Sequence, residues 1–214
     1  MTVIIICQAR ADRTYAPMPW PKEHKNETRE RIVRAAAAVF RERGIAEVSV
    51  GEIMRRAGLT HGGFYAHFDS KDDLLEASVA QASVETSAFL ASSAEKAANP
   101  LVAAATAYLS PEHLAHPEFG CPIAAIGPEL ARGSGSVRQR LSEGIRSRLE
   151  RLGRLATGGI SAKVRRRRAA GALACMVGGI VLARGLSEPG GAELLADCRA
   201  FLREALAPDE KETR

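Results

Sequence analysis

Three closely spaced helix starts in the first third of the sequence limit what this chain can fold into. Ser49 followed by Glu52 has the spacing of a capping box, in which a hydroxyl and a carboxylate satisfy free N–H groups at a helix amino end. Thr60 follows a turn at Gly58 and predicts the N-cap of a third helix. Ser70 predicts the N-cap of a fourth, longer helix. The pattern indicates short helices packed closely together.

Helical periodicity dominates the rest of the chain. Apolar residues recur every three or four positions from Thr28 to Arg43, which predicts an amphipathic helix ending before Gly44. No segment alternates apolar and polar residues as a strand does. We therefore predict an all-α fold, with later helices over 101–109, 121–132, 137–155, 162–184 and 192–206. Because Pro128 interrupts the segment 121–132, that helix is expected to be kinked or split.

Composition is that of an ordinary globular protein with a small positive charge. The 214 residues are 46% hydrophobic and carry a formal charge of +5, which favours a polyanionic partner. The segment from Lys22 to Glu76 nevertheless contains ten basic and ten acidic residues, so any phosphate-binding face must come from their arrangement. Four dispersed cysteines without metal-type spacing favour a reducing cytoplasm: Cys7, Cys121, Cys175 and Cys198.

The first 24 residues are expected to form a flexible arm. The apolar run from Val3 to Ile6 is too short to span a membrane, and no basic region precedes it as in a secretory signal. Three prolines follow between residues 17 and 21. A mis-assigned start codon and an edge strand are the alternatives. Arg10, Arg13 and Lys22 are interpreted as solvated, with a contact to DNA as the alternative.

Residues 49–66 have the layout of a helix-turn-helix. This motif needs two short helices at a fixed angle, so that the second lies in the major groove while the first braces it. Ile53, Leu59 and Phe64 are spaced to pack the helices together. The residues expected to face outward are Thr60, His61, Gly62, Gly63 and Tyr65.

The run from Gly58 to Phe68, followed by Ser70-Lys71-Asp72-Asp73-Leu74, resembles the signature of the TetR family of transcriptional regulators. The resemblance covers residues 28–75 and implies an N-terminal DNA-binding domain with a C-terminal helical domain for ligand binding and dimerisation. It divides the chain into an arm (1–24), a helix-turn-helix domain (25–70) and a ligand-binding and dimerisation domain (71–214).

Residue roles follow from this resemblance where positions match. It implies that Tyr65 and Lys71 hold phosphates, with Lys71 beside the amino end of the fourth helix. Base reading would fall to Thr60, His61 and the backbone at Gly62 and Gly63, and Ser49 and Val50 would lie near the flanking phosphate. His67 either meets DNA or packs inside the domain.

The resemblance also implies a homodimer whose last two helices pair with those of a second subunit. Ala170, Ala174, Gly178 and Leu182 form a stripe of mostly small residues that allows close helix approach. Packing within one chain is the alternative. Two-fold symmetry then predicts a palindromic operator with recognition helices about 34 Å apart.

The ligand site of the family lies among the middle helices. Pro122 suits a first helical turn, which places Cys121 at an N-cap where backbone N–H groups stabilise a thiolate. Cys121 is therefore a candidate sensor of electrophiles or oxidants, with an inert core residue as the alternative. The candidate pocket residues are Tyr108, Phe119, Cys121, Ile126 and Met176.

The sequence predicts neither a cofactor nor a metal, and it contains no common catalytic motif. His113, His116 and Cys121 match no standard metal spacing. Lys163 and the run Arg165–Arg168 are interpreted as a solvated face with acidic partners, with a nucleic-acid contact as the alternative. We therefore expect a non-enzymatic repressor that a small-molecule effector releases from operator DNA. The alternative is a helix-turn-helix activator or chromosome-associated protein without a ligand.

Overall fold

The computed structural model describes residues 22–207, and within this range every regular element is helical. The all-α prediction is thus confirmed. The elements are α1 (Lys22–Arg43), α2 (Val50–Arg56), η1 (His61–Ala66), α3 (Lys71–Ala94), α4 (Pro100–Tyr108), α5 (Pro111–Ala115), η2 (Pro117–Phe119), α6 (Pro122–Arg132), α7 (Gly135–Leu155), α8 (Ala162–Arg184) and α9 (Gly190–Ala205).

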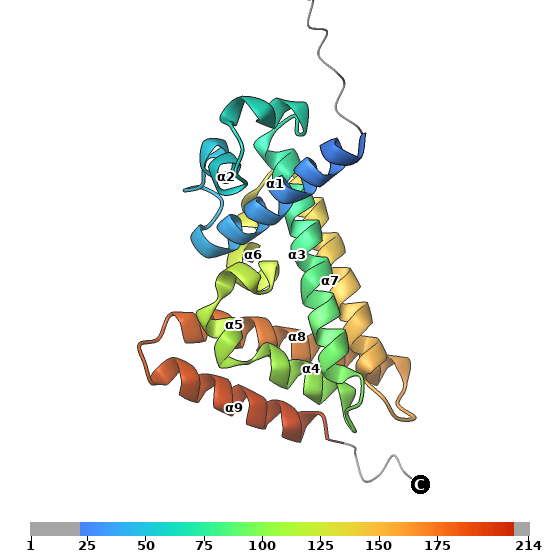
Figure 1. Cartoon of the computed structure of the whole chain (residues 1–214). Coiled ribbons are helices and arrows are strands. Elements are labelled where there is room, and N and C mark those ends of the chain that lie inside the picture. The colour runs from blue at the N-terminus through green and yellow to red at the C-terminus, as the bar shows by residue number, and fades with distance from the viewer. Residues whose placement is uncertain (1–21, 208–214) are drawn as a thin grey trace, which may run out of the picture.

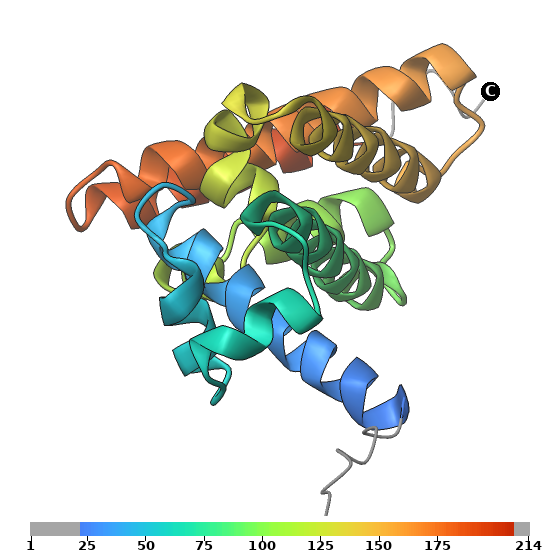
Figure 2. The same cartoon turned by 90° about the horizontal axis from the view of Figure 1, so that it is seen from above.

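Two long helices connect the ends of the molecule. Helices α3 and α7 run side by side along its length, with α1, α2 and η1 at one end (Figure 1). Helices α8 and α9 lie next to each other across the opposite end, and α4, α5 and α6 fill the space between (Figures 1 and 2). No helix in the described part combines the length and apolar character needed to cross a bilayer.

The buried side chains form two clusters. The first joins α1, α2, η1 and the start of α3 to Ile126 and Leu130 of α6 and Val137 of α7. The second gathers side chains from α3, α4 and α7 to α9, together with Cys121 at the start of α6. Helix α3 contributes to both, with Leu74 in the first cluster and Leu90 in the second. The helix-turn-helix end therefore packs on α6 and α7 as well as on itself.

Two of the three predicted N-caps form as expected. The Ser49 hydroxyl accepts a hydrogen bond from the Glu52 backbone N–H at 3.2 Å, and the Ser70 hydroxyl accepts one from the Asp73 N–H at 3.0 Å. The Thr60 side chain makes no capping hydrogen bond. The third element is a 3₁₀ helix, which is the more tightly wound form. Adjacent glycines at 62 and 63 disfavour a regular α-helix there.

Three larger differences from the sequence expectations concern α1, the segment 111–119 and α6. Helix α1 begins at Lys22, before the predicted Thr28, so the last residues of the expected arm are helical, while residues 1–21 lie outside the described range. The short elements α5 and η2 were not predicted; each begins at a proline, which suits a first helical turn. Helix α6 continues through Pro128 as one helix, because the ring lies on the exposed side and only one backbone hydrogen bond is lost.

Replacing Ser49 by alanine should lower the free energy of unfolding by about 1 kcal/mol, the usual loss when an N-cap hydroxyl is removed. Thr60→Ala is the matched control, because its hydroxyl caps nothing and its loss should cost clearly less. Urea unfolding followed by circular dichroism measures both. Equal losses in the two variants would contradict the capping assignment.

Candidate nucleic-acid interface and internal cavity

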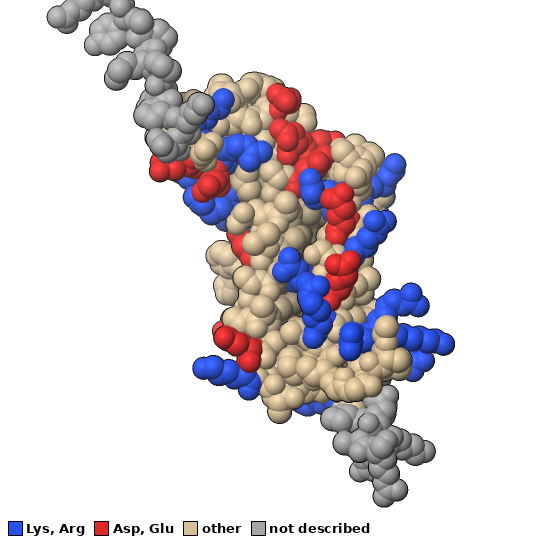
Figure 3. Space-filling model, turned by 90° about the vertical axis from the view of Figure 1, so that its right-hand side faces the viewer, with Lys and Arg blue, Asp and Glu red and all other residues tan. Residues whose placement is uncertain are grey.

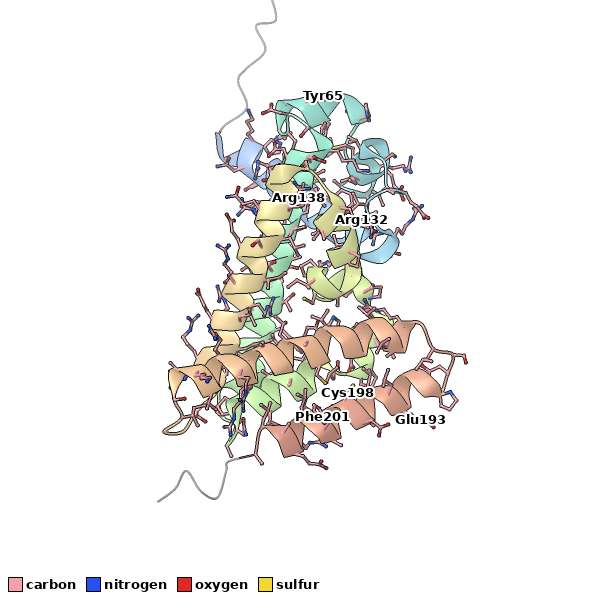
Figure 4. The ribbon with its side chains drawn as sticks, turned by 180° about the vertical axis from the view of Figure 1, so that it is seen from behind. Tyr65, Arg132, Arg138, Glu193, Cys198 and Phe201 are labelled. Carbon is pink, nitrogen blue, oxygen red and sulfur yellow. The ribbon has the colours of Figure 1, made fainter. Side chains whose placement is uncertain are left out.

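Element η1 presents an exposed surface at the end of the molecule farthest from α8 and α9. Tyr65 is 70% exposed there and lies at the opposite end from Phe201 on α9 (Figure 4). Thr60, His61 and Gly62 are exposed as well, and Gly63 is half-buried. A side chain added at Gly62 would meet no atom within 4 Å, so the backbone itself is open to an approaching partner.

The opposite side of η1 is held in the first cluster. Phe64 is fully buried, its ring stacks on Phe68 with centroids 5.8 Å apart, and the edge of Tyr65 meets it at 5.2 Å. Ile53 is buried and Leu59 packs on the same cluster, which confirms the predicted contact between the two short helices. This packing fixes η1 against α2, so its outer face is presented as a rigid unit.

Ser49 and Val50 lie at the amino end of α2, where Ser49 is exposed and Val50 half-buried. His61 is close to this end, because its ring lies 3.4 Å from where a side chain on Gly51 would begin. The amino end of α2 and the start of η1 thus form one continuous surface. Free N–H groups at a helix amino end favour an anion.

Two candidate residues are turned partly inward. The Lys71 amine donates a hydrogen bond to the Ile45 carbonyl at 2.6 Å and lies 5.9 Å from the Phe40 ring centre. His67 is half-buried, and burial, together with the charges of Lys25 and Arg29, lowers its pKa, which disfavours the charged form. Lys71 therefore has structural contacts in this state, whereas the buried Nδ1 of His67 has no hydrogen-bond partner among the described residues.

Sequence reasoning missed Lys25 and Arg29 as part of this surface. Both are exposed on α1, close enough to His67 to affect its charge, and Arg29 lies 4.6 Å above the Phe68 ring. Neither forms an ion pair within the described residues. Residues 22–76 carry equal numbers of basic and acidic residues, but the charges are not paired evenly. Arg43 and Arg56 form ion pairs with Glu52 and Glu42, whereas Lys25 and Arg29 do not pair with any described residue. Positive charge therefore remains unpaired beside η1.

A cavity of about 280 Å³ lies between α3 and the segment from α4 to the start of α6. Three of the five predicted pocket residues line it: Tyr108, Phe119 and Cys121. Ile126 and Met176 do not, because Ile126 is buried in the first cluster and Met176 in the second. The remaining wall comes from Glu85, Thr86, Phe89, Ser110, Glu112, His113, His116 and Gly120.

His113 organises one side of this cavity. Its Nδ1 lies 2.7 Å from the Tyr108 carbonyl and its Nε2 accepts a hydrogen bond from the Cys121 N–H at 3.0 Å. These partners require a neutral ring with the proton on Nδ1. Burial lowers the pKa of His113 to about 4, with Arg184 and Arg41 acting in the same direction. His113 therefore joins α4, α5 and α6 without carrying charge at neutral pH.

Cys121 occupies the N-cap position of α6, as predicted, but its side chain makes no capping hydrogen bond. It is 1% exposed, whereas reactive cysteines are partly accessible. This burial favours packing over the predicted sensing role. No group of three or more His, Cys, Asp and Glu side chains within the described range could hold a metal.

Arg41 is a buried charge that sequence reasoning did not identify. It lies on α1 and is 5% exposed. Its guanidinium donates to the carbonyls of Ala37 and Gly120 at 2.9 and 2.8 Å and to the Glu85 carboxylate at 3.4 Å. Two of these partners, Gly120 and Glu85, belong to the cavity wall.

Helices α8 and α9 carry an exposed apolar face. Of the predicted dimer residues, Ala170, Ala174 and Leu182 are exposed and Gly178 is half-buried with open space above it. Gly171, Val181 and, on α9, Phe201 extend this face. Packing within the chain does not cover the stripe. Gly179, by contrast, faces the interior of the chain. A side chain added at Gly179 would meet Cys198 of α9 and Leu109, which follows α4.

The basic run at the start of α8 is exposed. Lys163, Arg165, Arg166 and Arg167 form no ion pair with another described residue, so the expected acidic partners are not seen in residues 22–207. Figure 3 shows positive side chains gathered at the lower end of this face of the molecule.

Comparison with known proteins places the strongest similarity in the helix-turn-helix segment. Residues 32–78 match the family model for bacterial regulatory proteins of the tetR family. The transcriptional regulator TtgR of Pseudomonas putida is 41% identical over 56 residues, which cover 26% of this chain and 27% of TtgR. AcrR of Shigella flexneri is 42% identical over 53 residues, 25% of each chain. The matched segment thus spans about a quarter of these relatives' length.

Solved structures are similar over most of the chain. A TetR transcriptional regulator from Chloroflexus aurantiacus superposes with a TM-score of 0.73 at 26% identity, covering 87% of this chain and 98% of that one. A TetR regulator from Legionella pneumophila gives a TM-score of 0.71 at 19% identity, over 83% and 96% of the two chains. The likeness in fold therefore includes the C-terminal helices.

The half-buried, neutral His113 should make stability depend on pH. Its pKa is about 4 in the folded chain against an ordinary 6.5, so the unfolded chain binds more protons between these values. The stabilisation is present above pH 6.5 and is lost as the pH falls through 4. Its size is on the order of 3 kcal/mol. His113→Gln should remove this part of the acid sensitivity, measured as urea unfolding free energy at several pH values. Identical pH profiles would contradict the assignment.

Proposed function

We propose that the chain is a ligand-responsive transcriptional repressor of the TetR family, because residues 32–78 match the tetR family model and a TetR regulator of 26% identity superposes over most of the chain. It binds a palindromic operator as a homodimer and leaves the operator when a small molecule enters the cavity. The observation that carries this proposal is the rigid, exposed outer face of η1, anchored by the buried Phe64.

The outer face of η1 suits the major groove. Thr60 and His61 supply exposed polar groups for base edges, and the missing side chains at Gly62 and Gly63 let the backbone approach closely. The Tyr65 hydroxyl is placed to donate to a phosphate. Around this face, Ser49 and Val50 at the start of α2 and the cations of α1 would contact the DNA backbone.

Lys71 and His67 are expected to contribute less to DNA binding than the outer face of η1. The ammonium of Lys71 has three donors and uses one on Ile45, so a phosphate contact would use another. His67 is half-buried, and burial together with the nearby charges of Lys25 and Arg29 lowers its pKa, which disfavours a charged ring in the interface.

The exposed face of α8 and α9 is proposed as the dimer interface. The small residues Ala170, Ala174 and Gly178 would allow a second subunit to approach the helix closely. Leu182 and Phe201 are large, exposed apolar side chains that a second subunit could bury. A two-fold axis through this face would place both η1 elements at the same end of the dimer. Two half-sites about one turn of DNA apart, roughly 34 Å, would then be read together.

Selection from a random DNA pool by the purified chain tests the function directly. A repressor of this kind should enrich a palindrome and bind it more tightly than unrelated DNA by a factor of about 10³ or more at physiological salt. Binding that ignores sequence would instead favour a chromosome-associated protein.

Replacing Tyr65 by phenylalanine should weaken binding to the selected palindrome by about fivefold per half-site, since one phosphate hydrogen bond is lost, worth about 1 kcal/mol. The ring still packs on Phe64, so the unfolding free energy should stay the same. Fluorescence anisotropy with the palindrome and with a non-specific duplex measures the effect. Equal affinity of the variant and the wild type would remove Tyr65 from the interface.

Introducing a charge on the α8–α9 face should separate the subunits. Leu182→Glu places a carboxylate where apolar contact is proposed, and the mass from analytical ultracentrifugation should fall from dimer to monomer. Val84→Glu on α3 is a closely matched control, because both side chains are 62% exposed in the single chain. A dimer that persists in Leu182→Glu, or one lost equally in Val84→Glu, would place the interface elsewhere.

A further inference from the structure

Arg41 connects the helix-turn-helix end to the cavity wall. Its side chain leaves α1 in the first cluster and is almost fully buried. Buried guanidinium groups need acceptors for their N–H donors, because desolvation is costly. Here the acceptors include the Gly120 carbonyl, next to Cys121, and the Glu85 carboxylate of α3. The position of α1 is thus tied to two groups of the cavity.

Glu85 is shared between Arg41 and the cavity. Its side chain is 40% exposed, while that of Arg41 is 3% exposed. One carboxylate oxygen lies 3.4 Å from the Arg41 guanidinium and the other accepts a hydrogen bond from Gln81 at 3.1 Å. Because Glu85 also lines the cavity, a molecule bound there reaches the same carboxylate.

The charge of the cavity wall favours a cation. Among its lining residues are two carboxylates, Glu85 and Glu112, and neither a lysine nor an arginine. The half-buried His113 does not compensate for these carboxylates, since it is neutral, and the exposed His116 is paired with Glu118. Arg184 donates to the His113 carbonyl at 2.8 Å, and neither Arg184 nor Arg148, whose charges both reach Tyr108, is among the lining residues. An anion would therefore meet carboxylates without a free cation in the wall.

The remaining wall suits the body of an organic molecule. Phe89 of α3 and Phe119 of η2 are large exposed apolar residues that line the cavity. Aromatic faces attract cations as well as apolar groups. The Tyr108 hydroxyl is buried in the wall beside the Cys121 thiol, and it can donate to a polar atom of the ligand.

We propose that the cavity binds an aromatic organic cation, whose charge is neutralised by Glu85 in competition with Arg41. The proposed ligand binding does not depend on the proposed function. Only the effect of the ligand on DNA binding rests on the proposed function. Occupancy leaves the Arg41 guanidinium buried with carbonyl partners alone, which disfavours the present position of α1. Ligand and operator then oppose each other through one shared carboxylate, and each weakens the other by the same factor.

Three para-substituted benzyl alcohols test the ligand class on the full chain without DNA. They carry a trimethylammonium, a tert-butyl or a sulfonate group, so the first two have nearly the same shape and differ in charge. Calorimetry should show that the cation binds at least about tenfold more tightly than the neutral compound, equal to about 1.4 kcal/mol, and that the sulfonate does not bind. Binding of the three in any other order, or no binding of the cation, would overturn the proposal.

Glu85→Gln tests the residue. The variant keeps an oxygen for Arg41, removes the charge, and should lose about tenfold in affinity for the cation while its weak affinity for the tert-butyl compound stays the same. Glu76→Gln on the same helix α3, outside the cavity lining, is the control and should bind like the wild type. Unchanged cation affinity in Glu85→Gln would exclude Glu85 as the counter-charge.

The effect on DNA is measured separately with the selected palindrome. At concentrations that fill the cavity equally, the cation should reduce operator affinity in the wild type and have little effect in Glu85→Gln. Equal release in both proteins would refute the competition with Arg41. A chain that binds the cation but no palindrome would refute the proposed function and leave the ligand assignment standing.

Discussion

The packing of α3 into both hydrophobic clusters is the constraint on which the rest of the structure depends. Leu74 and Leu75 hold its amino end against α1 and η1, and Leu90 and Ala94 hold its other end in the second cluster. Because a helix is stiff along its axis, a displacement at one end is carried to the other. Glu85 lies between these two anchors, beside the cavity. The surface proposed to meet DNA and the cavity are therefore parts of one packed unit.

Local features of the sequence were sufficient to predict the helix-turn-helix. Helix caps depend on residues three positions apart, and the contacts of Ser49 and Ser70 form as their spacing indicates. The buried side of α1 likewise follows from its periodicity, since Ile32, Val39 and Phe40 are all buried. The winding of η1 did not follow, because helix-start signals do not distinguish a 3₁₀ helix from an α-helix.

The cavity could be predicted only in part, because its walls depend on contacts between distant segments. Tyr108, Phe119 and Cys121 lie near each other in sequence and were identified together. Ile126 follows Cys121 closely but points into the first cluster, and Met176 is enclosed by the second. Arg41 contacts Glu85 and Gly120, which are 44 and 79 residues away in sequence. No local sequence pattern predicts contacts at such separations.

The open space around Gly62 bears on how such a regulator changes its target. The position is exposed, and a new side chain would meet no protein atom within 4 Å. A single substitution there would add a group to the surface proposed to face the bases, without disturbing the packing that holds η1 in place. Duplicated genes for this protein would then have a short evolutionary route to separate sets of controlled promoters. Their folded scaffold, and with it the cavity proposed to bind a small molecule, would remain the same.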